Sequence, residues 1–201
     1  MARRPAGKGR LIAVEGTRGQ DVRDAAAALW HRFEAREVLG GVSNWDASGI
    51  FSDLRVEKRK HLSLSPRTLV LLYAADLVFR LRWQIRPALD QGQVIIAAPY
   101  VDTAVAFGVA EGLSRSWLTK LFAFAPSPDA CYRIKERGKA SRPKGKLLDG
   151  YVEFCTAILA DDVTAAGSVE LHREMLAYLE ELDGKNRCPR LTRRVISSQR
   201  A

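Results

Sequence analysis

Apolar runs and amphipathic segments alternate along the chain. Short apolar runs at residues 10–16, 93–100 and 118–127 predict buried strands, and residues 41–49 predict a short strand followed by a turn. Segments with apolar residues three or four positions apart predict the helices. These helices are expected over residues 21–38, 65–92, 128–138, 146–162 and 168–182. Strands separated by helices predict an α/β fold with three layers, in which a parallel central sheet has helices on both faces.

Residues with strong local preferences mark several helix ends. Ser65 is a plausible N-cap followed by Pro66 in the first turn, and Gly92 ends this stretch, which is either one long helix or two abutting helices. Pro128 is expected in the first turn of the helix over residues 128–138, with Gly138 at its end.

The composition fits one globular domain. The 201 residues are 47% hydrophobic and 27% charged, and a core of this size needs neither disulfides nor a metal. The three cysteines have no metal-ligand or CxxC spacing, which is typical of free thiols in a reducing compartment. No apolar run approaches the ~20 residues of a membrane span. We therefore expect a cytoplasmic protein without a membrane partner, whose domain covers residues 11–184 between basic tails at 1–10 and 185–201.

The formal charge of +9 raises the question of a polyanionic partner. Much of the positive charge lies in the two tails and in an internal cluster at residues 133–146. Basic tails bind nucleic acid weakly through counterion release, but no interleaved aromatic residues offer a surface for stacking bases. Solvated tails and a weak polyanion contact both remain open.

The turn between the first strand and the first helix is the main candidate for chemistry. Its sequence is "GTRGQDVR", residues 16–23, and a Gly-rich turn at this place is where a phosphate-binding loop lies. Gly16 and Gly19 favour such a turn, but the lysine is missing. Asp21 just before an alanine-rich run is a good N-cap, with Asp24 also near the positive end of the helix dipole. The favoured interpretation is a capped helix in place of a ligand site.

The order of segments over residues 11–182 resembles the thymidylate kinases, a family of P-loop nucleoside monophosphate kinases. "EGTRGQDVR" is similar to the family's E-G-x-D-G-x-G-K-[ST] loop, "LLYAADL" to its "LLFAADR" helix, and "AAPY" to its strand with the D-R-Y signature. "LFAFAPSPDACYRIKERG" resembles the strand and helix that lead to the family's lid. The resemblance implies a P-loop-kinase-like fold.

The departures from the family pattern fall on the positions that handle phosphate. Three are in the loop, where the third glycine, the lysine and the Ser/Thr are replaced. The other three are on the acceptor side, the positions that in the family contact the nucleoside monophosphate and the transferring phosphoryl group, where two arginines and an aspartate are lost. The replaced positions are Asp21, Val22 and Arg23, then Leu77, Ala98 and Pro99. Because phosphoryl transfer depends on positioned cations, these losses predict no catalytic residue, no metal and no cofactor. ATP and Mg²⁺ are expected only if the chain is active by another route.

Other positions that the resemblance associates with nucleotide binding are retained. The remnant comprises Gly16, Arg18, Gly19, Tyr73, Tyr100, Asp102 and Phe107, and the lid-like cluster contains Arg133, Arg137 and Arg142. Each has a structural interpretation as well: Tyr73 as core rather than as the ring that stacks on thymine, Phe107 as packing, and the cluster as a solvated loop. Asp76 and Asp102 are expected to orient neighbouring groups rather than to act as bases.

Three functions follow for testing. The favoured one is a pseudokinase that acts as a binding, scaffold or regulatory module. The resemblance implies a homodimer through the helices around residues 65–86, with another protein and a thymidine nucleotide as further candidate partners. The alternative is an active dTMP or nucleoside monophosphate kinase in which Arg18, Arg23 or lid residues replace the lost lysine. The third is a nucleic-acid-associated accessory subunit that uses the basic tails.

Overall fold

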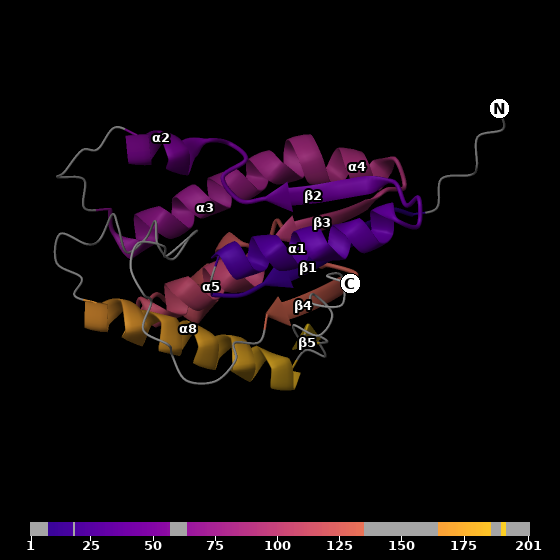
Figure 1. Ribbon diagram of the computed structural model, residues 1–201. Helices are drawn as coiled ribbons and strands as arrows, with labels where there is room; N and C mark the ends of the chain where they lie inside the picture. Colours follow the sequence, from indigo (N-terminus) through magenta and orange to yellow (C-terminus); the bar gives the residue numbers. More distant parts are fainter. Residues whose placement is uncertain (1–7, 18, 57–63, 135–164, 186–189, 192–201) are drawn as a thin grey trace, which may run out of the picture.

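The computed structural model describes residues 8–17, 19–56, 64–134, 165–185 and 190–191 (Figure 1). In chain order the elements are β1 (Arg10–Glu15), α1 (Gly19–Glu34), β2 (Gly40–Asn44), α2 (Ile50–Val56), α3 (Pro66–Arg80), the π-helix η1 (Leu81–Ile85), α4 (Arg86–Asp90), β3 (Val94–Ala98), α5 (Val101–Ala110), α6 (Arg115–Leu121), β4 (Ala130–Ile134), α8 (Ala165–Lys185) and β5 (Arg190–Leu191). The helix expected over residues 146–162 lies outside the described residues.

The strands form one parallel sheet in the order β2-β3-β1-β4-β5, with β1 in the middle. Successive side chains of β1 point to opposite faces of the sheet. Leu11 and Ala13 join the larger core under α3, α5 and α8, whereas Ile12 and Val14 join a smaller core under α1. Figure 1 shows α1 on one face of the sheet and α3 and α5 on the other. The predicted α/β fold with helices on both faces is confirmed.

The long helical stretch after residue 65 is also confirmed. Ser65 is the N-cap of α3, its hydroxyl oxygen accepts a hydrogen bond from the Thr68 amide at 3.1 Å, and Pro66 occupies the first turn. The helix continues through η1 into α4, and Gly92 follows with a φ of 75°, a conformation that favours glycine. A single helical rod of three abutting segments therefore runs from Pro66 to Asp90.

Two predicted elements are wrong: a helix stands where a strand was expected, and a strand where a helix was expected. Residues 118–127 were expected as a strand, but the chain forms α6 and a turn there, because Leu118 and Leu121 bury one helical face. Residues 128–138 were expected as a helix, but β4 occupies this place and pairs with β1. The Asp129 carboxylate accepts a hydrogen bond from the Leu11 amide at 2.8 Å, so the strand pairing outweighs the helix-start signal of Pro128.

The last long helix, α8, packs against α5 (Figure 1). Leu171, Met175 and Leu179 are buried at a spacing of four residues and form its apolar face. This confirms the amphipathic helix predicted for residues 168–182. The exposed pair between Arg115 and Glu181, at 3.0 Å, joins α6 to the far end of α8.

Candidate functional site

The connection between β1 and α1 forms the candidate phosphate loop. The Gly16 amide donates to the Thr103 hydroxyl at 3.2 Å, and Thr17 is buried. Helix α1 begins at Gly19, two residues before Asp21, so Asp21 lies in the first helical turn and is not the N-cap. The prediction that Asp21 is the N-cap was wrong, because only residues 16–18 separate β1 from α1 and the helix therefore begins before Asp21. An acidic group in the first turn still interacts favourably with the helix dipole.

Val22, at the position where the resemblance implies the family's lysine, has an apolar environment. The side chain is 1% exposed and packs in the smaller core with Ala25, Ala26 and the residues of β1 that face α1. A Cβ atom added at Gly16 would lie 3.0 Å from Val22 Cγ2 and 3.2 Å from Ile134 Cγ1. The absence of a side chain at residue 16 therefore lets Val22 fill the space beneath the turn. The neighbouring Arg23 is half-buried.

Glu15, the last residue of β1, holds the start of α5. Its carboxylate accepts hydrogen bonds from the amides of Tyr100, Asp102 and Thr103 at 3.0–3.1 Å, and from the Thr103 hydroxyl at 2.6 Å. Burial, and secondarily the charge of Asp102, raise the pKa of Glu15 to about 7. An internal carboxylate thus occupies the anion-binding end of α5, which has no cap from its own N-cap side chain.

Arg133 links this cluster to α8. Its guanidinium donates to the Asp102 carboxylate at 2.7 Å and to the Leu179 carbonyl at 2.6 Å. The expectation that Arg133 belongs to a basic lid is therefore wrong, because the residue lies in β4 with its side chain buried in an ion pair. Arg18, Arg137 and Arg142 lie outside the described residues.

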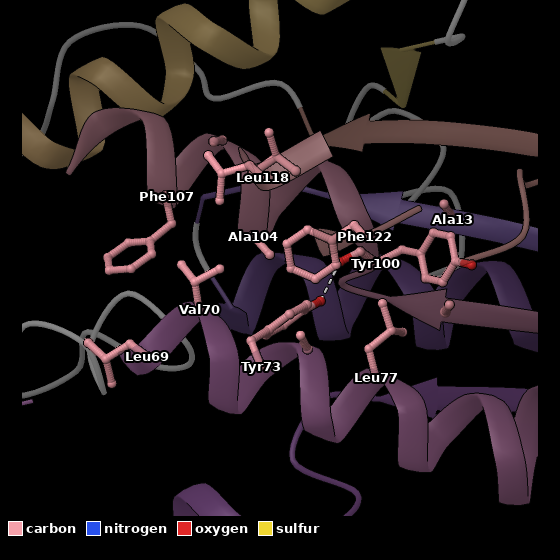
Figure 2. Close-up of a cluster of buried hydrophobic side chains, with 14 of the residues drawn as sticks. Ala13, Leu69, Val70, Tyr73, Leu77, Tyr100, Ala104, Phe107, Leu118 and Phe122 are labelled. Carbon is pink, nitrogen blue, oxygen red and sulfur yellow. Dashed lines mark hydrogen bonds between the residues drawn. The ribbon is translucent and has the colours of Figure 1, made fainter. Parts of the chain in front are cut away.

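The residues on the acceptor side are packed against other parts of the chain. Leu77 and Ala98, which replace an arginine and an aspartate of the family, are fully buried. Figure 2 shows Tyr73 pointing from α3 toward Tyr100, whose backbone carbonyl accepts a hydrogen bond from the Tyr73 hydroxyl. Burial raises the pKa of the Tyr73 hydroxyl above its ordinary range. The Tyr73 ring lies within the core, as the structural interpretation expects, and so does Phe107.

Tyr100 is the residue that follows the lost Asp-Arg pair, and it is buried as well. Its hydroxyl donates to the Pro126 carbonyl at 2.8 Å. Burial, followed by the charge of Glu15, raises the pKa of this hydroxyl above its ordinary range. Both tyrosines of the proposed nucleotide remnant are thus held by backbone carbonyls of the chain.

Arg80 is a buried cation that the sequence interpretation missed. The side chain is 0% exposed and donates to the Ser43 hydroxyl at 3.0 Å, the Ser43 carbonyl at 2.6 Å and the Pro99 carbonyl at 2.9 Å. It lies one helical turn after Leu77, near the carboxyl ends of β2 and β3. Its position three residues after Leu77, on the apolar face of α3, is the signal that could have revealed it.

The turn after β2 is organised by two aspartates. Asp76 accepts from the amides of Asp46 and Ser48 at 3.0 and 2.9 Å, and from the Ser48 hydroxyl at 2.8 Å. Asp46 has a φ of 59° and accepts from the amides of Phe51 and Ser52 at the start of α2. Asp76 therefore orients the backbone of the turn, and Asp102 orients the Arg133 side chain through their ion pair. Both roles agree with the prediction that these aspartates orient neighbouring groups.

Two features are absent from the described residues. No cluster of three or more His, Cys, Asp or Glu side chains there could hold a metal ion. Among the same residues, no helix is both long and apolar enough to cross a membrane.

Comparisons with known proteins point to one family. No family model matches the sequence. A probable thymidylate kinase 2 of Saccharolobus solfataricus is 31% identical over 128 residues, which cover 64% of this chain and 60% of that protein. A probable thymidylate kinase of Pyrococcus abyssi is 35% identical over 83 residues, covering 39% and 40%. One from Pyrobaculum calidifontis is 28% identical over 152 residues, covering 66% and 72%. The chain thus spans less than two thirds of the first two relatives.

The fold is also shared with a solved structure. The crystal structure of thymidylate kinase from Ehrlichia chaffeensis aligns with a TM-score of 0.60 over 92% of this chain and 88% of that chain. The sequence identity is 16%, so this likeness concerns the fold. Sequence and fold together make the chain a relative of the thymidylate kinases, with the fold of the P-loop kinases.

Proposed function

We propose that this thymidylate-kinase-like chain has lost ATP-dependent phosphoryl transfer and acts as a binding, scaffold or regulatory module. The observation that carries the proposal is Val22, which is 1% exposed and packed in the smaller core at the position of the phosphate-binding lysine. A lysine there neutralises the β- and γ-phosphates of the nucleotide. An apolar side chain turned into the core offers no such charge.

The acceptor side supports the same proposal. Leu77 and Ala98 are buried where the family has an arginine and an aspartate. The nearby cation, Arg80, directs its guanidinium at the carbonyls of Ser43 and Pro99. Each transition-state contact of this kind contributes about 3 kcal/mol, so losses on both sides are not offset by one relocated arginine.

Calorimetry with ATP and Mg²⁺ tests the proposal directly. We expect no binding at micromolar nucleotide and no conversion of dTMP to dTDP by the full chain. The Saccharolobus solfataricus relative, assayed in parallel, serves as a control for the assay conditions. Micromolar ATP binding by this chain, or turnover of dTMP, would contradict the proposal.

An active kinase with a non-standard loop is the second candidate. It is favoured by the names of the relatives and by Arg23, a half-buried cation that follows Val22 in α1. If turnover occurs, Arg23→Gln should lower it about 100-fold, because one positioned cation is lost. The exposed Arg36→Gln is the matched control and should leave turnover unchanged.

A thymidine nucleotide is the ligand that the relatives' names suggest. Because the Tyr73 ring is buried and its hydroxyl is bonded to the Tyr100 carbonyl, a base could stack on it only if Tyr73 moved. We therefore expect neither dTMP nor thymidine to raise the melting temperature. A rise with dTMP but not with ATP would instead indicate a pocket that keeps the acceptor and has lost the donor.

A role in nucleic-acid binding remains a proposal for the tails. The charges of the described residues are close to balance, so the positive excess lies in the rest of the chain. Binding to duplex DNA should then fall steeply with salt, and deletion of the basic tails at residues 1–10 and 185–201 should abolish it. Salt-independent binding would contradict this role.

A further inference from the structure

The side chain of Thr103 connects the start of α5 to the end of β1. Thr103 is buried in the first turn of α5, and its hydroxyl contacts both Glu15 and the first residue of the turn toward α1. The hydroxyl oxygen lies 2.6 Å from Glu15 Oε2, 3.2 Å from the Gly16 amide nitrogen and 3.2 Å from the Gly16 carbonyl oxygen. Three polar atoms of β1 and the turn therefore meet one buried hydroxyl.

The Thr103 hydroxyl has one hydrogen and two acceptors within reach. A threonine hydroxyl donates one hydrogen bond and accepts up to two. The Gly16 amide is a donor, so the Glu15 carboxylate and the Gly16 carbonyl compete for the single hydroxyl hydrogen. While Glu15 is ionised, the carboxylate receives this hydrogen, because a short bond to a charged acceptor is stronger than a longer bond to a neutral carbonyl.

Protonation of Glu15 reverses this preference. The other hydrogen-bond partners of the carboxylate described above are backbone amides, which only donate, whereas the Thr103 hydroxyl can also accept. A proton taken from solvent onto Glu15 Oε2 is therefore donated to the Thr103 oxygen, and the hydroxyl hydrogen turns to the Gly16 carbonyl. The Thr103 oxygen then accepts from Glu15 and from the Gly16 amide and donates once, which uses its full capacity.

Several packed elements bring ionisable side chains to the carboxyl end of β1. Glu15 shares the alternation of Leu11 and Ala13, so it lies on the face of the sheet that α3, α5 and α8 cover, whereas α1 lies on the opposite face. Strand β3 carries no ionisable side chain, and α8 turns an apolar face to the core. The ionisable side chains at this end of the other elements are Tyr73, Asp76 and Arg80 of α3, Tyr100 and Asp102 at the start of α5, Arg133 of β4, and Asp21, Arg23 and Asp24 at the start of α1.

Among these groups, Asp102 is the charge that acts on Glu15 most strongly. Its amide donates to Glu15 Oε1 at 3.0 Å, while its carboxylate pairs with Arg133, the register partner of Glu15 in β4. The guanidinium of Arg80 is directed at backbone carbonyls. Burial, and secondarily the charge of Asp102, raise the pKa of Glu15 to about 7, so both protonation states are populated near neutral pH.

We propose that Glu15 and Thr103 form a pH-sensitive switch that sets how the turn between β1 and α1 is held. With Glu15 ionised, the carboxylate holds the Thr103 hydroxyl and the amides of Tyr100 and Thr103 at the start of α5. With Glu15 protonated, Oε2 is a weaker acceptor for these amides, and the hydroxyl holds the Gly16 carbonyl instead. The switch thus exchanges a contact of α5 for a contact of the turn, whether or not the chain transfers phosphoryl groups.

An NMR titration of the isotope-labelled full chain between about pH 5 and pH 9 tests the switch. It follows the carboxyl carbon of Glu15, the carbonyl carbon of Gly16 and the amide proton of Tyr100. We expect all three signals to move with one midpoint, at about pH 7. On acidification the Gly16 carbonyl should shift downfield as it gains a hydrogen bond, and the Tyr100 amide proton should shift upfield as its hydrogen bond weakens.

Substitutions of Thr103 separate the switch from a general effect of pH. Thr103→Val removes the hydroxyl but keeps the shape of the side chain, so the Gly16 carbonyl should no longer follow the titration. Glu15 should still titrate, at a higher midpoint, because a hydrogen bond that favours its ionised form is lost. Thr103→Ser keeps the hydroxyl and should restore the Gly16 shift. Thr119→Val, at an exposed position of α6, is the matched control and should leave all three signals unchanged.

The wild-type titration can overturn the switch even if Thr103→Val does not fold. A Gly16 carbonyl signal that stays constant while Glu15 titrates would show that the hydroxyl does not turn. Absence of a Glu15 titration in this pH range would remove the trigger. A Gly16 shift that persists in Thr103→Val would show that another group carries it. ATP binding or dTMP turnover would overturn the proposed loss of phosphoryl transfer and leave the NMR result unchanged, so the two failures are distinguishable.

Discussion

The two halves of the candidate site are built in different ways. At the start of α1, the position where the resemblance implies a lysine holds Val22, which packs with Ala25 and Ala26 in the smaller core. At the carboxyl ends of β2 and β3, charges remain, but Arg80 and Asp76 point inward and bond to the backbone of the chain itself. One half is closed by packing, and the other is closed by internal hydrogen bonds.

This difference has an energetic consequence. A packed apolar residue contributes through buried area and tolerates similar apolar replacements, whereas a buried guanidinium depends on each of its acceptors. The acceptor half should therefore be the more sensitive to single substitutions. Four substitutions test this comparison.

The largest effect is expected for Arg80→Met. The change removes three hydrogen bonds and leaves the carbonyls of Ser43 and Pro99 buried without their donor. The free energy of unfolding should fall by about 3–5 kcal/mol in urea titration. Arg86→Met, an exposed arginine of the same rod, should change it by less than about 0.5 kcal/mol. A small effect at Arg80 would remove the contrast between the two halves.

A smaller but still large effect is expected for Val22→Lys, which restores the family's residue. The ammonium would have to enter an apolar core, so the free energy of unfolding should fall by about 3 kcal/mol. Val22→Ile, a volume increase without charge, should change it by about 1 kcal/mol. Recovery of ATP binding without loss of stability would mean that the turn between β1 and α1 can still accommodate a phosphate group.

Glu15→Gln tests the junction between the two halves, and its effect depends on pH. Because the folded-state pKa of Glu15 is raised from 4.5 to about 7, the folded chain binds the proton more tightly than the unfolded chain. This contribution to stability is fully present below pH 4.5 and is lost as the pH rises to about 7, with a slope of at most about 1.4 kcal/mol per pH unit.

Melting curves between pH 4.5 and 8 should therefore show wild-type stability declining relative to Glu15→Gln as the pH rises toward 7. At pH 4.5, where wild-type stability is greatest, the variant should be about 2 kcal/mol less stable, because its amide cannot accept four hydrogen bonds. This difference should shrink as the pH rises toward 7. A difference that does not change with pH would contradict the raised pKa.

The smallest effect is expected for Tyr73→Phe. This change removes the hydrogen bond to the Tyr100 carbonyl but keeps the ring in the core, so the loss should be about 1 kcal/mol by urea titration. Tyr132→Phe, at a half-buried position in β4, is the comparison variant and should stay within about 0.5 kcal/mol. Equal effects of the two would indicate that the buried hydroxyl contributes nothing specific.

The parts of the fold that follow local rules were predictable. β1 and β3 are continuous apolar runs, and the Ser65-Pro66 start of α3 is a local signal. The exchange of α6 and β4 was not predictable from the local pattern, because it depends on pairing with β1 and on the close approach of Leu118 to Gly108. A Cβ at Gly108 would lie 2.7 Å from Leu118 Cδ2.

For the candidate site, the sequence identified the positions that depart from the family pattern but not the contacts that their side chains make. The departure at Val22 is evident in "GTRGQDVR", where the resemblance implies a lysine. Helical spacing places Arg80 on the buried face of α3, but the hydrogen-bond partners of Arg80 and Glu15 are not evident, because they lie 19 and 85 or more residues away along the chain. Long-range hydrogen bonds of buried charges leave no periodic signal.

The fit between residue 16 and Val22 has a consequence for sequence variation. Since an added Cβ at Gly16 would meet Val22 Cγ2 at 3.0 Å, the two positions share one volume. In a library randomised at both sites and selected for folding, alanine at 16 should survive mainly beside a residue smaller than valine at 22, and isoleucine at 22 mainly beside glycine. Each position thus limits the mutational routes open to the other.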